Sequence, residues 1–133
     1  MPIEQIETEL KQAANGLLML SETDEPFEFY YDKDFAHEEL NEETVLKMAG
    51  MPAQYPVEVV ELDYFLRNQT RPPEETPDAL ARGERFQQLQ AKLQDLLQDV
   101  KVYRVGETRI TAYILGKTED GEIAGLTTVV VET

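Results

Sequence analysis

The sequence predicts an α/β/α sandwich in which helices cover both faces of a mainly antiparallel sheet. Two amphipathic helical stretches, near residues 3–18 and 77–100, flank two strand-like runs at 27–31 and 57–62. Three further apolar runs close the chain, as expected for successive hairpins. With 133 residues, 41% of them hydrophobic, the chain is long enough to bury a core of its own, and we expect one domain over residues 1–133.

The first element is an amphipathic helix from about Ile3 to Leu18. Its apolar residues recur at steps of three and four: Ile3, Ile6, Leu10, Ala13 and Leu17. The next run, Phe27–Tyr31, is rich in aromatic residues and alternates in polarity, which predicts a strand. Pro26 suits the first position of that strand.

The middle of the chain carries local signals for a short helix and a second strand. Asn41 can cap a helix that stops at Gly50. After a linker loop, Val57–Leu62 is rich in β-branched residues and reads as a strand. Asp63 can cap a helical turn over residues 64–66.

A proline-rich acidic loop precedes the second long helix. Gln69–Pro77 contains three prolines and two glutamates, which predicts an exposed loop. Thr76 then suits the helix N-cap and Pro77 the first helical position. The apolar face of the helix is Phe86, Leu89, Leu93, Leu96 and Val100.

The C-terminal part is predicted to be β. Val102–Val105, Arg109–Leu115 and Ile123–Val131 are separated by turns that contain Gly106 and Gly121, giving two successive hairpins. Both faces of the last strand are largely apolar, so we expect it to be covered on both sides, by the two long helices.

The net charge of −15 is concentrated in the first half of the chain. Residues 1–63 carry 16 acids and three bases, a balance of −13, whereas residues 64–133 carry 11 acids and nine bases, a balance of −2. Such a field repels nucleic acid and anionic membranes and attracts basic proteins. The chain has no cysteine, no leader pattern and no apolar run near 20 residues, so we expect a cytoplasmic, soluble protein.

Residues typical of catalysis are sparse. Ser21 and His37 are the only serine and histidine, and a Ser-His-acid arrangement would require them to meet. No glycine-rich phosphate loop follows a strand, and the calcium-loop match over residues 32–43 lacks the obligatory glycine. We therefore expect a protein that is not an enzyme and has no cofactor or metal of its own, with a hydrolase using clustered carboxylates as an alternative.

The junction over residues 17–28 is the candidate binding feature. An apolar run passes into an acidic segment with a proline and then into another apolar run. Buried residues on both sides would hold the carboxylates rigidly toward a positively charged partner, although a solvated loop fits the same pattern. The last residues, 129–133, follow directly from a buried strand, so the α-carboxylate of Thr133 could act as a fixed anionic ligand.

Several motifs along the whole chain together resemble the nuclease A inhibitor family. They are Leu10-Lys11-Gln12-Ala13, Gly16-Leu17-Leu18, Ser21-Glu22, Pro26-Phe27-Glu28, Val102-Tyr103-Arg104-Val105-Gly106-Glu107, Gly121 and Val130-Val131-Glu132-Thr133. The resemblance implies an α/β/α sandwich. It also implies a protein inhibitor of a sugar-non-specific, magnesium-dependent endonuclease of the ββα-metal type.

The resemblance also implies roles for particular carboxylates. Glu22 and Thr133 would approach the catalytic metal of the nuclease and displace the DNA phosphates that it binds, and they should therefore lie on one edge of the molecule. Asp24 and Glu25 would steer the inhibitor onto the basic cleft. The partner is thus expected to be a metal-dependent endonuclease. We favour a monomer as the oligomeric state of the inhibitor itself.

A second acidic loop is implied to contribute to the same contact. The family has an acid followed by tryptophan there, and the matching positions are Glu74 and Glu75, so the acid is kept and the aromatic is missing. Aromatic anchors are often worth about 2–4 kcal/mol at an interface centre. The alternative is therefore an acidic interaction module of the same fold that binds a different basic partner.

Overall fold

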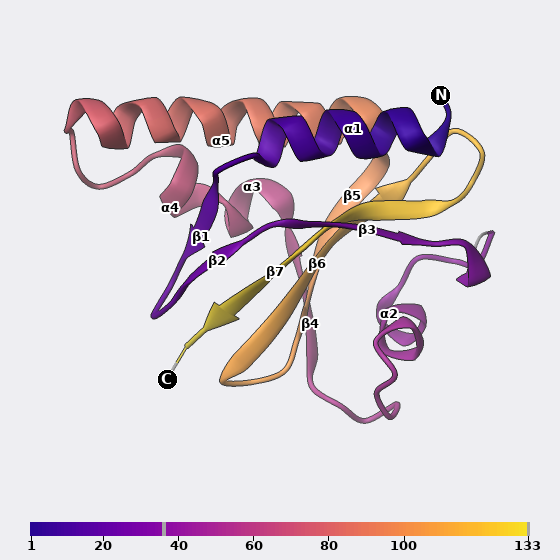
Figure 1. Cartoon of the computed structure of the whole chain (residues 1–133). Coiled ribbons are helices and arrows are strands. Elements are labelled where there is room, and N and C mark those ends of the chain that lie inside the picture. Colours follow the sequence, from indigo (N-terminus) through magenta and orange to yellow (C-terminus); the bar gives the residue numbers. More distant parts are fainter. Residues whose placement is uncertain (36, 133) are drawn as a thin grey trace.

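The computed structural model, which describes residues 1–35 and 37–132, is built on a five-stranded antiparallel sheet (Figure 1). The strand order is β3-β7-β6-β5-β4. The strands are β3 Glu28–Asp32, β4 Val57–Glu61, β5 Gln98–Val105, β6 Arg109–Lys117 and β7 Ile123–Val131. The three strands that end the chain form its centre, as two successive hairpins, and the earlier strands flank them. The predicted antiparallel sheet is therefore confirmed.

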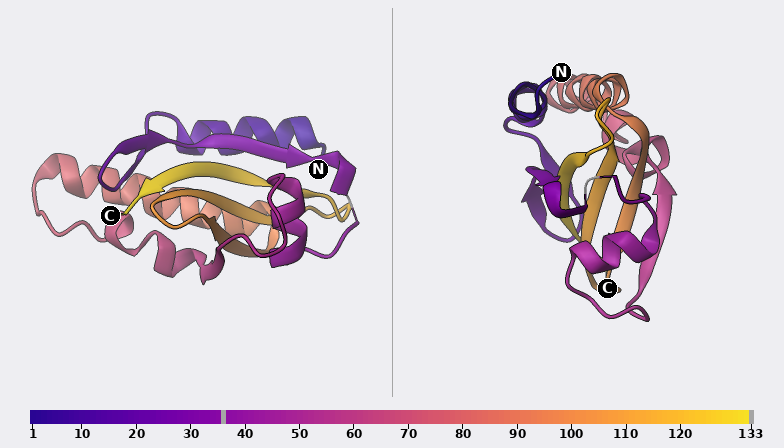
Figure 2. Two further views of the ribbon diagram at one scale, coloured as in Figure 1. Left: turned by 90° about the horizontal axis from the view of Figure 1, so that it is seen from below. Right: turned by 90° about the vertical axis from the view of Figure 1, so that its right-hand side faces the viewer.

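The two long helices, α1 (Ile3–Ala14) and α5 (Pro77–Leu96), run side by side on one face of the sheet (Figures 1 and 2). Their buried residues share one apolar cluster with the sheet, including Ile6, Leu10, Phe86, Leu89, Leu93, Val102, Ile114 and Leu126. Arg85 of α5 donates to the carbonyls of Ala13 and Asn15, at 3.2 and 2.8 Å. The prediction that these helices cover opposite faces is wrong, because polar side chains of α5 bind α1 directly.

A second apolar cluster uses the strand residues that alternate with those of the first. Tyr103, Val105, Leu115 and Ile123 pack there against Val45 and Leu46 of α2 (Glu42–Met48). The Asn41 side chain accepts a hydrogen bond from the Thr44 amide at 2.9 Å, which confirms the predicted cap. The mixed α/β class is therefore confirmed, and a seven-residue helix rather than a long one packs on this cluster.

The chain leaves α1 earlier than predicted and forms a hairpin. Gly16 has φ +77°, in the left-handed region that ends helices, so the predicted continuation to Leu18 is wrong. β1 (Leu18–Leu20) and β2 (Asp24–Pro26) instead pair antiparallel as a separate two-stranded sheet. The acidic junction is therefore a hairpin whose tip is residues 21–23.

Two short helices follow β4: α3 (Leu62–Phe65) and α4 (Arg67–Thr70). The predicted cap is wrong, because Glu61 is the N-cap of α3 and Asp63 lies within its first turn, accepting from the Tyr64 amide at 2.8 Å. Gln69 is buried in α4 rather than in the exposed loop. These helices place side chains beside the hairpin described above.

The start of α5 is as predicted, and its end is not. Thr76 accepts a hydrogen bond from the Ala79 amide at 3.2 Å, and Pro77 occupies the first turn. The helix stops at Leu96, and β5 begins at Gln98, four residues before the predicted strand. The backbone therefore changes from helix to strand earlier than the apolar pattern indicates. Asp99, with φ +54°, lies at an irregularity near the start of β5, where the register of β5 against β6 shifts.

Candidate functional site

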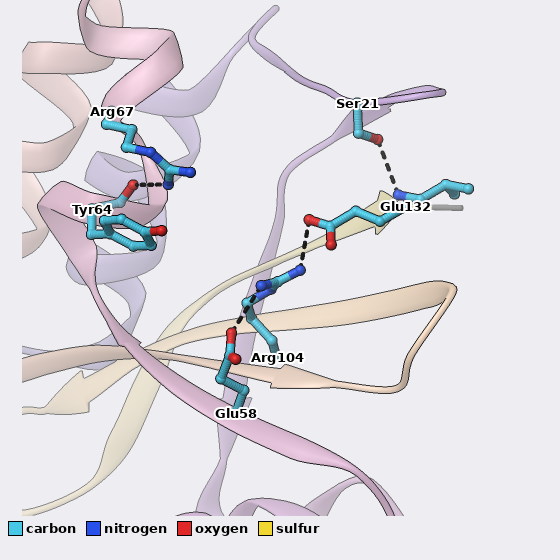
Figure 3. Close-up of polar contacts among 7 residues, drawn as sticks. Ser21, Glu58, Tyr64, Arg67, Arg104 and Glu132 are labelled. Atoms are coloured by element: carbon cyan, nitrogen blue, oxygen red, sulfur yellow. Dashed lines mark hydrogen bonds and ion pairs between the residues drawn. The ribbon is translucent and has the colours of Figure 1, made fainter.

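The tip of the β1–β2 hairpin is bonded to the end of β7. Ser21 Oγ accepts a hydrogen bond from the Val131 amide at 3.0 Å (Figure 3). The Glu22 amide donates to the Val131 carbonyl at 3.3 Å. The Ser21 amide also donates to the Thr23 carbonyl at 3.0 Å, which closes the turn. Glu22 is thereby held beside a residue two positions before Thr133, which itself lies outside the described residues.

The sequence around the hairpin explains how it is held. Within β1 and β2, Met19 is buried on the inner side, whereas Leu18 and Leu20 are each 38% exposed. Thr128 of β7 donates its hydroxyl to the Pro26 carbonyl at 2.9 Å, which fastens β2 to the main sheet. The acidic tip is therefore positioned by one buried apolar side chain and by hydrogen bonds that come from β7.

Arg104 joins two carboxylates from distant parts of the chain at this end of the sheet. Its guanidinium is 2.9 Å from Glu58 of β4 and 2.7 Å from Glu132, which follows β7 (Figure 3). The arginine side chain is 19% exposed, whereas the glutamates are 64% and 56% exposed. The Glu132 amide also donates to the Thr108 carbonyl at 2.9 Å, so both the backbone and the side chain of Glu132 are fixed.

A groove separates the hairpin and the end of β7 from α3 and α4. Its polar lining residues include Ser21, Glu22, Glu58, Tyr64, Arg67, Arg104 and Glu132. Tyr64 and Arg67 lie on the helical wall, opposite Glu58 and Glu132 (Figure 3). Glu22 lines the groove from the tip of the hairpin. The groove thus collects charged residues from four segments that are far apart in sequence, and it offers carboxylates to a cationic group.

The other predicted acids do not line the groove. Asp24 and Glu25 are neighbours in β2, so they point to opposite faces of the hairpin, and Glu25 accepts a hydrogen bond from the Thr23 hydroxyl at 3.3 Å. Glu74 and Glu75 are exposed in the loop between α4 and α5, at the same end of the molecule as the hairpin (Figures 1 and 2). A single flat surface therefore does not present all of these acids.

Close packing positions the second acidic loop. A Cβ on Gly83 of α5 would lie 2.9 Å from Pro72 Cδ and 3.2 Å from the Thr70 carbonyl oxygen. The absence of a side chain at this buried position lets the start of the loop lie directly against the helix. The exposed residues that follow, including Glu74 and Glu75, extend from this fixed point.

Arg104 and the pair Tyr64–Arg67 are site residues that sequence reasoning missed. The strand prediction for Val57–Leu62 carried a usable signal, since β4 pairs with β5 in a register that sets Glu58 opposite Arg104. Opposite charges at facing positions of neighbouring strands are typical stabilising pairs. Tyr64, in the predicted helical turn, is 54% exposed.

The structure does not bring the two candidate catalytic side chains together. Ser21 is bonded at the end of β7, whereas the His37 amide donates to the carbonyl of Gly121, just before β7 begins, at 3.1 Å. In the described ranges 1–35 and 37–132, no group of three histidine, aspartate or glutamate residues is arranged to hold a metal ion. Within the same ranges, no helix is both long enough and apolar enough to cross a membrane.

Fold and site together define a small acidic α/β protein whose distinctive feature is a groove lined with carboxylates across one end of the sheet. A family model described as "Nuclease A inhibitor-like protein" matches residues 4–133, essentially the whole chain. The chain therefore belongs to the nuclease A inhibitor-like family, which confirms the resemblance found in its motifs. No curated protein matches the sequence.

Proposed function

We propose that this protein inhibits a sugar-non-specific endonuclease of the ββα-metal type by binding over its active site. Family membership indicates a nuclease as the partner and a role other than catalysis. The groove and the acidic hairpin tip form the contact surface, and the carboxylates of Glu22 and Thr133 are directed at the catalytic metal of the nuclease.

The observation that carries this proposal is the pair of hydrogen bonds between the hairpin tip and Val131, at 3.0 and 3.3 Å. Without them, Glu22 and the last residues of the chain would belong to independent segments. With them, one acid from each end of the sequence can approach the same target. The hairpin is then already ordered in the free protein, so binding does not incur the entropy cost of ordering it, and this favours affinity.

The chemistry of inhibition follows from the ligands that magnesium prefers. Mg²⁺ binds oxygen ligands in a strict octahedral geometry and, in phosphoryl transfer, contacts the phosphate oxygens of the substrate. Carboxylates of the inhibitor that occupy those positions prevent the DNA phosphates from binding the metal of the nuclease. The acidic surface steers the inhibitor toward a basic cleft, and Asp24, Glu25, Glu74 and Glu75 contribute to this attraction from around the groove.

The test is a titration of DNA cleavage by a ββα-metal endonuclease at low salt with Mg²⁺ present. We expect the wild-type protein to abolish cleavage near one equivalent, and Glu22→Gln to need at least tenfold more protein. Asp95→Asn is the matched control, because it removes one exposed carboxylate from α5, outside the groove, and should inhibit like the wild type. Full cleavage at stoichiometric excess over several such nucleases would refute the proposal.

The second candidate function is binding of a different basic protein by the same groove. The observation that favours it is that the chain contains no tryptophan, whereas the family resemblance implies an aromatic residue at the position of Glu75. Capture of a defined basic protein by the wild type, lost in Glu22→Gln, together with undisturbed nuclease activity, would support this alternative. Recovery of a nuclease from the host lysate would instead support inhibition.

A further inference from the structure

The most exposed aromatic side chain of the described residues lies on the wall of the groove. Tyr64, in α3, is 54% exposed and lines the groove together with Glu22 and Glu132. Exposed large hydrophobic residues are ordinary when scattered, but this ring lines both the groove and a neighbouring hollow between α3, α4 and α5. A protein that fills the whole groove would therefore also contact this ring.

Arg67 holds the ring in place. Its guanidinium carbon is 3.8 Å from the ring centroid, and its Nη1 donates to the Tyr64 carbonyl at 2.7 Å. Arg67 thus contacts both the ring and the backbone carbonyl of Tyr64. A tyrosine that is already ordered loses little rotamer freedom when a partner packs against it, so more of the buried area is converted to affinity.

We propose that Tyr64, held by Arg67, is the aromatic anchor for the protein bound in the groove, and that it packs against apolar or backbone groups beside the basic cleft of that protein. The inference rests on the proposed function and names a second part of the contact surface. Charge complementarity indicates the occupant: the carboxylates of Glu22, Glu58 and Glu132 fit a basic surface. Arg67 covers one face of the ring, so the partner's cations pair with the carboxylates and its apolar groups with the remaining ring surface.

Two substitutions separate the ring from its hydroxyl group. Tyr64→Ala removes the anchor and should weaken binding to a Mg²⁺-loaded ββα-metal endonuclease roughly 30-fold, the effect of a typical interface hot spot. Tyr64→Phe keeps the ring and should stay within about threefold of the wild type. Arg67→Met leaves the ring without its cation and should weaken binding about two- to fivefold.

The control is Tyr55→Ala, which removes another exposed tyrosine, 36% accessible, that is outside the groove lining. Affinities are measured by calorimetry without DNA, and unfolding curves establish that each variant is folded. If Tyr64→Ala and Tyr55→Ala bind equally well, the anchor is refuted while the proposed function stands. If the wild type binds no such nuclease, the proposed function and the anchor both fall.

Discussion

Replacement of Ser21 by alanine tests whether the contact between hairpin and β7 positions Glu22. The serine hydroxyl accepts from the Val131 amide at 3.0 Å and donates to the Thr23 carbonyl at 3.1 Å, so the substitution removes both bonds and leaves the Val131 amide without its acceptor. Val131 is half-buried, which lets water satisfy the amide in part. We expect a loss of about 1–2 kcal/mol in the free energy of unfolding.

Three measurements follow from this magnitude. The thermal midpoint should fall by roughly 3–10 °C for a chain of this size. Hydrogen exchange at the Val131 amide should become about 5–30 times faster, because local opening now requires less free energy. The inhibition constant for a ββα-metal endonuclease should rise by a similar factor, about 5–30-fold, since binding must restore the order that the hydroxyl maintained.

Thr8→Ala is the matched control. The Thr8 hydroxyl also donates to a backbone carbonyl, that of Glu4 at 2.9 Å, but it lies on the exposed face of α1. This variant should change neither the Val131 exchange rate nor inhibition. Unchanged exchange at Val131 in Ser21→Ala would show that the hydroxyl does not hold the tip. Faster exchange with undiminished inhibition would show that the held tip is irrelevant to binding, and the positioning role of Ser21 would be refuted.

Three further outcomes are expected. Arg104→Met should lower the free energy of unfolding by only about 1 kcal/mol, because Glu58 and Glu132 are more than half exposed and regain water; a loss above about 3 kcal/mol in urea would contradict this. Raising NaCl from about 50 to 500 mM should slow association with the nuclease at least tenfold and leave dissociation nearly unchanged, and a salt-independent association rate would argue against steering. Burial raises the pKa of Tyr113 above 10.0, so the unfolded chain loses this proton first and stability falls as pH rises above that value; Tyr113→Phe should decline less steeply, and parallel curves would contradict the assignment.

The sequence signals that succeeded are those that depend on neighbouring residues. The caps at Asn41 and Thr76 act on amides three positions away, and both were predicted correctly. The two C-terminal hairpins likewise join strands that follow one another. The face on which α5 packs was not predictable in this way, because Arg85 finds its acceptors on α1, 70 and 72 positions earlier in the chain.

The candidate site shows the same limit more sharply. The sequence singled out the acidic junction and the end of the chain separately, and only the family resemblance placed them on one edge. The bond that joins them connects Ser21 to Val131 across 110 positions, and it requires the hairpin that replaced the predicted end of the first helix. Sequence periodicity carries no information about the distant amide from which the Ser21 hydroxyl accepts a hydrogen bond.

The arrangement around Arg104 explains how an acidic groove can keep its carboxylates directed at a partner. Carboxylates held near one another with no cation between them would repel each other and turn away into solvent. Arg104 reduces this repulsion from a more buried position. Its side chain is 19% exposed, and it pairs with two glutamates whose side chains remain 56% and 64% exposed. The cation is thus largely withdrawn from the partner, whereas the anions are accessible to it. A nuclease whose cleft supplies a metal ion and basic side chains would therefore meet carboxylates that are already oriented, so less side-chain freedom is lost when Glu58 and Glu132 pair with its cations.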